Sequence, residues 1–221
     1  MKSIISSCNF RKVVFLLQII FFVEAQHFCS ADPTYGFTPV HFTAQTRKLQ
    51  KPYNKSPHER YSNKDGVENF WIYNHDKPFQ KHNPTRPRSE IRISGYDYTT
   101  RVWQFEGNFL VPQGTSGVTI MQIFGASKQA TALQLRVYDG DLKYYAHNVV
   151  AANIYDKWVR LNVIHNVAAG KVTIFIDGKR KFVARDHGRA TFYFKYGVYG
   201  ALYRSSNYMQ SSWRGIKLFK K

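Results

Sequence analysis

The chain has 221 residues, and 32 Lys and Arg against 14 Asp and Glu give it a formal net charge of +18. A hydrophobic content of 43% with 16% aromatic residues is enough to build a core, which excludes a disordered basic tail. Only two cysteines, Cys8 and Cys29, are present, so the sequence predicts neither a disulfide framework nor a metal site. No nucleotide-binding glycine loop is found, and no cofactor is predicted.

The first segment, residues 1–31, is predicted to be a secretory signal peptide. Three basic residues precede an apolar run over residues 13–23, and small residues suited to cleavage follow at Ala25 and at Ala31. The run is well short of the roughly 20 residues that a membrane span needs, so no stable span is expected. Loss of the segment removes three basic residues and Glu24, which leaves a charge of +16.

The predicted secretion changes which binding partners are expected for the positively charged protein. A protein of the secretory pathway does not ordinarily encounter nucleic acid, so no nucleic-acid partner is predicted. The vacuole, the extracellular space and the cell wall all remain open as the final compartment.

The mature chain is predicted to be one domain, residues 32–221, with two parts. Residues 32–87 contain seven prolines and one aromatic run at 70–73, which indicates an irregular wrapping segment. Residues 88–221 change to an alternating pattern, in which Leu133, Leu135 and Val137 alternate with polar neighbours, and this period of two is typical of half-buried strands.

Short strands and glycine turns recur through the second part. Asp139-Gly140 and Asp177-Gly178 supply residues that tolerate a positive φ in tight hairpins. The predicted strands continue over residues 142–145, 160–165, 172–176, 181–184, 192–199 and 212–219. This pattern predicts an all-β fold, an antiparallel β-sandwich or jelly roll, with few or no long helices apart from the signal peptide.

Alternation also assigns polar side chains to faces. In the segment 88–93, Arg88, Glu90 and Arg92 point one way and the two isoleucines the other. Gln122 shares a side with Phe124, and a third face carries Tyr193, Lys195 and Tyr199. Any one of these faces alone is better explained as a solvated surface with ion pairs worth at most about 1 kcal/mol each. The three together favour a concave cationic groove, because Arg offers paired donors to carboxylates and Tyr offers a stacking face.

The three segments 88–92, 121–124 and 193–199 resemble the signature segments of the alginate-lyase-2 jelly rolls, whose bacterial members are polysaccharide lyases. A closer resemblance is to the plant citrate-binding protein family within that superfamily. It spans the mature chain and is carried by residues 32–34, 85–92, 103–107, 114–118, 135–140, 153–156 and 206–209.

The resemblance implies roles for individual residues. Arg88 and Gln122 would bind a carboxylate, Arg92 and Lys195 would support the positive field, and Tyr199 would be the proton donor of a lyase. Glu90, Arg136 and Tyr193 complete the expected ligand-binding set.

The sequence departs from the lyase pattern at two places. The family's lyases carry His where this chain has Phe124, which can neither titrate nor hydrogen-bond as imidazole does. The Gln that follows the second Tyr of the lyase segment is also missing, since Gly200-Ala201 stands there. A histidine from elsewhere could reach the groove; the candidates are His75, His82, His147, His165 and His187.

We therefore expect a non-catalytic binding protein for carboxylates, with citrate or an acidic polysaccharide as the partner. The alternative is a lyase for a polyuronate such as glucuronan or an alginate-like polymer, acting by β-elimination with Tyr199 as acid and base.

Overall fold

The computed structural model describes residues 32–221, so the predicted signal peptide lies outside the described residues. The described chain consists of β-strands and two short 3-10 helices, which confirms the all-β prediction. In chain order the elements are β1 (Thr38–Val40), η1 (Ala44–Thr46), β2 (Arg47–Gln50), η2 (Pro57–Glu59), β3 (Tyr61–Lys64), β4 (Val67–Tyr73), β5 (Arg88–Ile93), β6 (Val102–Leu110), β7 (Val118–Phe124), β8 (Thr131–Tyr138), β9 (Asp141–Tyr144), β10 (Asn148–Ala151), β11 (Val159–Asn166), β12 (Lys171–Ile176), β13 (Lys179–Arg185), β14 (Tyr193–Gly200) and β15 (Tyr208–Lys220). No helix in this part of the chain is long and apolar enough to cross a membrane.

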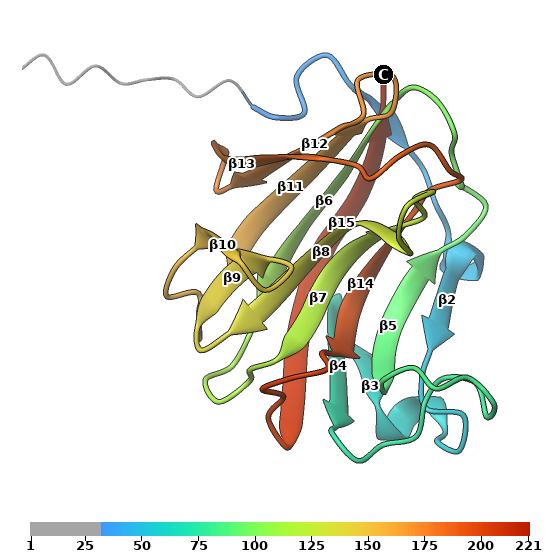
Figure 1. The fold of residues 1–221 in the computed structure, drawn as a ribbon, viewed down its shortest axis with the longest axis vertical. Coiled ribbons are helices and arrows are strands. Elements are labelled where there is room, and N and C mark those ends of the chain that lie inside the picture. Colours follow the sequence, from blue (N-terminus) through green and yellow to red (C-terminus); the bar gives the residue numbers. More distant parts are fainter. Residues whose placement is uncertain (1–31) are drawn as a thin grey trace, which may run out of the picture.

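The strands form two antiparallel sheets that lie one behind the other (Figure 1). The seven-stranded sheet has the order β10-β9-β8-β7-β14-β5-β2, and the eight-stranded sheet has the order β13-β12-β11-β6-β15-β4-β3, with β1 beside β15. At the centre of each sheet, strands that are neighbours in space are far apart in sequence: β14 lies between β7 and β5, and β15 lies between β6 and β4. This crossed order is the predicted sandwich of the jelly-roll type.

Three hairpins close on Asp-Gly pairs. The pairs 139–140 and 177–178 were expected from the sequence, and 65–66 between β3 and β4 is a third. In each pair both residues have positive φ, from 49° to 52° at Asp and from 76° to 86° at Gly. Two-residue turns of this kind match the right-handed twist of the strands that they connect.

Aromatic side chains join the two sheets in the core. Tyr196 of β14 in the seven-stranded sheet contacts Phe70, Phe105 and Trp213 of the eight-stranded sheet, with ring centroids 5.6 to 5.8 Å apart. All four side chains are fully buried. Burial of each large apolar side chain is worth about 1.5–3 kcal/mol, so this cluster stabilises the packing of the two sheets. It thereby fixes the position of the seven-stranded sheet, whose other face points away from the core.

Residues 32–87 contain more regular structure than the sequence predicted. Four strands lie in this segment, and β4 is hydrogen-bonded on both sides, to β15 and to β3. Along β4, Glu68, Phe70 and Ile72 are buried, so a charged residue occupies one of the inward positions. Glu68 therefore interrupts the apolar alternation by which the sequence would reveal β4. A carboxylate can be buried there only where hydrogen-bond donors from other parts of the chain satisfy it.

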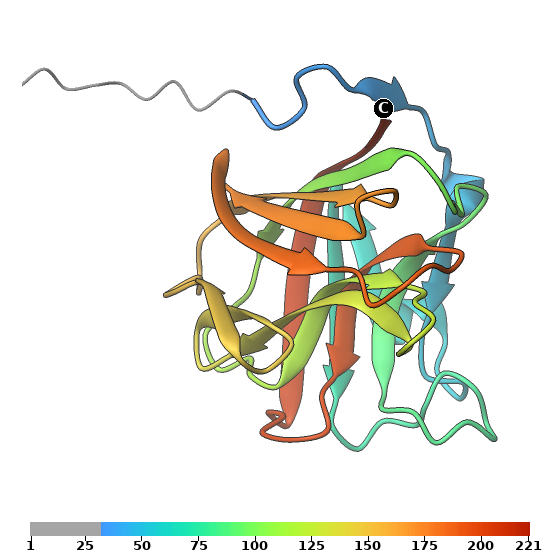
Figure 2. The same cartoon turned by 45° about the horizontal axis from the view of Figure 1, so that its top comes forward.

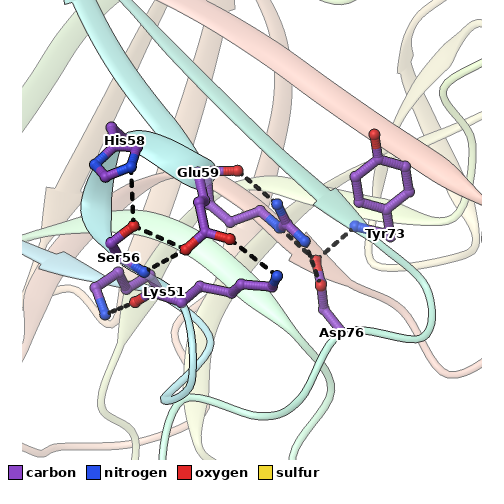
Figure 3. A network of polar contacts seen from close by, with 8 residues as sticks. Lys51, Ser56, His58, Glu59, Tyr73 and Asp76 are labelled. Atoms are coloured by element: carbon purple, nitrogen blue, oxygen red, sulfur yellow. Dashed lines mark hydrogen bonds and ion pairs between the residues drawn. The ribbon is translucent and has the colours of Figure 1, made fainter.

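A polar network joins η2 and the residue that follows it to the start of the β4–β5 loop (Figure 3). The helix η2 begins with a capping box, in which the backbone N–H of Ser56 donates to Glu59 Oε2 over 2.8 Å. That bond, together with Lys55, lowers the pKa of Glu59 to about 2. The next residue, Arg60, donates to both oxygens of Asp76 at 2.7 Å. Asp76 also accepts the N–H of Tyr73, so the loop that leaves β4 is held at its first residues.

Candidate functional site

The three segments that carry the expected groove residues lie on adjacent strands of the seven-stranded sheet. Lys195 of β14 lies opposite Arg92 of β5 on one side and opposite Gln122 of β7 on the other. Tyr199 lies opposite Arg88. The isoleucines between the charged residues of β5 are buried in the core, as the alternation predicted. The polar side chains of β5, β14 and β7 therefore share the face that points away from the core.

Glu90 is the centre of this face. Its carboxylate accepts hydrogen bonds from Arg88 Nη1 at 3.1 Å, from Lys195 Nζ at 2.5 Å and from Gln122 Nε2 at 2.6 Å. Only 2% of Glu90 and 1% of Lys195 is exposed to solvent. A carboxylate buried to this extent requires such partners, because desolvation of an unpaired charge is strongly unfavourable. Burial lowers the pKa of Lys195 from its usual value, and Glu90 offsets part of that shift.

One glycine makes the contact between β5 and β7 possible. Gly197 is the residue of β14 that lies opposite Glu90, and it has a φ of 134°. A Cβ at this position would lie 2.5 Å from the carbonyl oxygen of Ser89 and 3.0 Å from Cβ of Glu90. Because no side chain stands there, the Glu90 side chain crosses β14 and reaches Gln122 on the far side.

Aromatic rings support the two arginines of β5. The guanidinium of Arg88 lies 4.2 Å from the ring centroid of Tyr199, and that of Arg92 lies 4.0 Å from that of Tyr193. Tyr193 in turn stacks on Phe124 at 5.1 Å. Cation–π contacts of this kind are worth about 0.5–2 kcal/mol and hold the guanidinium planes in fixed orientations. Burial raises the pKa of the Tyr193 hydroxyl, which favours its neutral form.

These side chains line a cleft of about 340 Å³. The seven-stranded sheet, with β2 at its edge, provides the floor, and the β4–β5 loop contributes further side chains. The lining residues are Gln50, Phe79, Gln80, Asn83, Thr85, Arg88, Gln122, Phe124, Ala130, Thr131, Gln134, Tyr193, Lys195 and Tyr199.

Five of the eight residues expected at the site line the cleft, namely Arg88, Gln122, Tyr193, Lys195 and Tyr199. The other three do not. Glu90 lies beneath the donors that it binds, and Arg92 pairs with Asp97 at 2.5 Å. Arg136 donates from Nε and Nη2 to Gln134 Oε1, at 2.9 and 2.6 Å, which holds its guanidinium on β8.

The wall of the cleft and three strand residues that line it, Gln50 of β2 and Thr131 and Gln134 of β8, were not predicted from the sequence. Gln134 shares the parity of Arg136 on β8, so its position on this face could have been read from the alternation. Phe79, Gln80, Asn83 and Thr85 come from a loop without periodicity, and no pattern in the sequence assigns their direction.

None of the histidines in the described residues lines the cleft. His165, one of the five candidates, is fully buried elsewhere, where its ring nitrogens contact Tyr98 Oη at 3.0 Å and Asp186 Oδ2 at 3.1 Å. His187 contacts Tyr144 Oη at 2.8 Å. Residues 32–221 hold no group of three His, Cys, Asp or Glu side chains that could bind a metal ion.

The charged side chains of the cleft carry more positive than negative charge. Arg88 and Lys195 carry two positive charges against the single carboxylate of Glu90, and Gln122, Gln134 and Tyr199 are neutral hydrogen-bonding groups. Arg88 Nε is buried and has no hydrogen-bond partner among the described residues. Charge-assisted bonds from such donors are about twice as strong as those between neutral groups, so an incoming carboxylate would meet strong donors in a partly desolvated site.

The fold and this cleft define a jelly-roll protein with a cationic, hydrogen-bonding cleft on one face. A family model described as alginate lyase matches residues 42–220, and the chain belongs to that family. Within it, the chain belongs to the plant citrate-binding proteins: it is 58% identical over 205 residues to the citrate-binding protein of Hevea brasiliensis, covering 93% of this chain and 86% of that one.

Solved structures with the same fold are alginate lyases of low sequence identity. The alginate lyase AlyA1 of Zobellia galactanivorans is 15% identical, with a TM-score of 0.63 over 81% of this chain and 97% of that one. The alginate lyase of Corynebacterium sp. is 16% identical, with a TM-score of 0.61 over 76% of this chain and 83% of that one. At this level of identity the likeness establishes the fold alone.

Proposed function

We propose that this protein binds small carboxylates, citrate foremost, in the cleft of the seven-stranded sheet and does not catalyse a reaction on them. The observation that carries the proposal is the unequal pairing at the cleft: Arg88 and Lys195 share one carboxylate, and Arg88 Nε has no partner among the described residues. The similarity to a citrate-binding protein supports the choice of ligand.

Citrate suits the donors because it carries several carboxylates on a compact body. One carboxylate would accept from Arg88, and a second could accept from Lys195 and from the neutral side chains of Gln122 or Tyr199. Because Glu90 already holds Arg88 and Lys195, a ligand shares these donors with a fixed negative charge. The affinity therefore depends on how much of the positive charge Glu90 leaves uncompensated.

Calorimetric titration with citrate, beside a neutral sugar of similar size, tests this proposal. We expect heat of binding with citrate only, and a loss of at least about tenfold in affinity for Arg88→Ala, the value of one charged hydrogen bond. Arg214→Ala is the matched control, because Arg214 also stacks on an aromatic ring at 4.2 Å, that of Trp158, but stands on the other sheet. Equal affinities of the two variants would exclude this cleft.

The second candidate is a polyuronate lyase. The fold of the alginate lyases and the place of Tyr199 in the cleft, beside Arg88, favour it. Phe124 and the lack of a cleft histidine in the described residues argue for binding without catalysis, since no imidazole stands beside Gln122. Ultraviolet absorbance of the 4,5-unsaturated product, measured over a panel of uronate polymers, distinguishes the two; any turnover that Tyr199→Phe abolishes would establish the lyase.

The predicted signal peptide supports entry of the protein into the secretory pathway, with the vacuole or the cell wall as its final compartment. Fusion of residues 1–31 to a fluorescent reporter tests this. A reporter that remains in the cytosol would contradict the prediction.

A further inference from the structure

A group of basic side chains without ion pairs among the described residues lies away from the cleft, on the β12–β13 hairpin. Five basic residues are exposed on this hairpin: Lys171, Lys179, Arg180, Lys181 and Arg185. The only acidic residue between them, Asp177, accepts the backbone N–H of Arg160. All ion pairs among the described residues are made by other side chains.

A second pocket, of about 290 Å³, opens beside this hairpin. Lys179 and Lys181 of β13 line it together with Lys157 of the β10–β11 loop, and Ile154 and Ile176 are among its apolar residues. The hairpin lies on the side of β9 and β10, away from β5 and β2 (Figures 1 and 2). The pocket shares no lining residue with the cleft of the seven-stranded sheet.

Protection of a sheet edge explains part of this charge. β13 is the last strand of the eight-stranded sheet, and lysines on an edge strand discourage pairing with another chain. Edge protection does not require Lys157, which belongs to a loop and not to the edge strand. Lys157, Lys179 and Lys181 bring three positive charges to the lining of this pocket against the single carboxylate of Asp177, and a bound anion would offset the excess.

We propose that the pocket and the hairpin form a docking surface for a linear polyanion, an acidic polysaccharide. One acidic group would lie among Lys157, Lys179 and Lys181, and the chain would continue along the remaining basic residues of the hairpin. Each exposed ion pair is screened by solvent and is weak on its own, so a single small anion is held weakly. A polymer that engages several contacts at once gains from its high effective local concentration.

The composition of the surface favours a polysaccharide over a lipid bilayer. Its exposed apolar side chain on β13 is Val183, 47% exposed, and no aromatic residue lines the pocket. Surfaces that insert into a bilayer combine basic residues with exposed Trp, Phe or Leu. The proposal is independent of citrate binding, because it uses a different set of side chains.

Cosedimentation with insoluble polygalacturonate at 20 mM and 300 mM salt tests the docking surface. The test variant is Lys179→Glu with Lys181→Glu, and the matched control is Lys64→Glu with Lys220→Glu, which changes the net charge equally at exposed positions outside the hairpin. We expect the test variant to bind the polymer at least about tenfold more weakly than the control at low salt. High salt should abolish the difference.

Citrate titration of the same proteins separates this result from that of the cleft. Both variants should bind citrate as the unmodified protein does, which also shows that they are folded. Equal polymer binding by the two variants would overturn the proposal, and so would loss of polymer binding in Arg88→Ala alone. Lysine-dependent binding to vesicles of phosphatidylserine and phosphatidylcholine without binding to the polymer would overturn it in favour of a membrane.

Discussion

Gln122 and Glu90 are hydrogen-bonded although a whole strand separates them. Gln122 Nε2 donates to Glu90 Oε2 over 2.6 Å, from β7 to β5, and β14 lies between. The contact crosses β14 beside Gly197, which lies opposite Glu90 and has no side chain that would block it. The polar face of the cleft is thus a property of three strands taken together, and each of these positions can be tested separately.

Gly197→Ala is expected to destabilise the protein more than backbone strain alone does. The new Cβ would lie 2.5 Å from the carbonyl oxygen of Ser89, in a backbone conformation with positive φ. Gly114→Ala is the control, because Gly114 also has positive φ, 88°, but meets no atom within 4 Å. Strain alone is worth about 1–3 kcal/mol, and we expect Gly197→Ala to exceed the control in urea unfolding by at least about 1 kcal/mol. Equal losses would show that the close approach is unimportant.

Glu90→Gln is expected to lower stability without ligand and to increase the stabilisation that citrate gives. Removal of one partner of a buried pair costs on the order of 3 kcal/mol, because Lys195 then stays buried without a counter-charge. A carboxylate ligand replaces that charge, so citrate should raise the melting temperature more in the variant than in the unmodified protein.

Glu106→Gln is the control for this prediction. Its carboxylate also accepts from a lysine and an amide, Lys217 at 3.0 Å and Asn162 at 2.8 Å, but it lies on the eight-stranded sheet. Citrate should stabilise that variant as it does the unmodified protein. A smaller citrate effect in Glu90→Gln than in Glu106→Gln would contradict the role given to Glu90.

The sequence was sufficient to assign faces within a strand, because the period of two is a local property of an extended backbone. Ile91 and Ile93 lie in the core, and Arg88 and Arg92 lie on the opposite side, as expected. That the three polar faces lie together was inferred from their combination and from the resemblance to a known family, and not from the alternation of any one strand. Alternation states which side a residue faces and says nothing of its partners, and so Arg136 was expected in a cleft that it does not line.

What the sequence could not predict depends on residues far apart in the chain. Glu68 interrupts the apolar alternation of β4, and it is acceptable in the core only because Arg47, Tyr61 and Tyr196 donate to its carboxylate at 2.8 to 2.9 Å. The loop wall of the cleft is hidden for a related reason. Its placement depends on Asp76 and on contacts between distant segments, not on any repeating pattern.

His165 is expected to make stability depend on pH. Burial lowers its pKa below the usual value of 6.5 in the folded protein, although Asp186 offsets part of the shift. The unfolded state therefore binds more protons, and the free energy of unfolding should fall as the pH drops below about 6.5. Urea unfolding at pH 7.5, 6.5 and 5.5 measures this slope.

His165→Gln removes the titrating group from the buried network and should flatten the slope between pH 6.5 and 5.5. His147→Gln is the control, because His147 is exposed. An unchanged slope in His165→Gln would show that other groups control stability in this range.

Arg60→Lys is expected to weaken citrate binding although Arg60 does not line the cleft. Lysine keeps the charge but loses the paired donation of Nε and Nη2 to Asp76, which anchors the β4–β5 loop, so stability should fall by about 1–2 kcal/mol. Because that loop supplies the cleft wall, the affinity for citrate should fall as well, while the heat of binding per mole of bound citrate persists. Lys55→Ala is the control, since the pair of Lys55 with Glu59 is about one third exposed and is screened by solvent. Unchanged citrate affinity in a destabilised Arg60→Lys would mean that the loop contributes shape to the cleft but no binding energy.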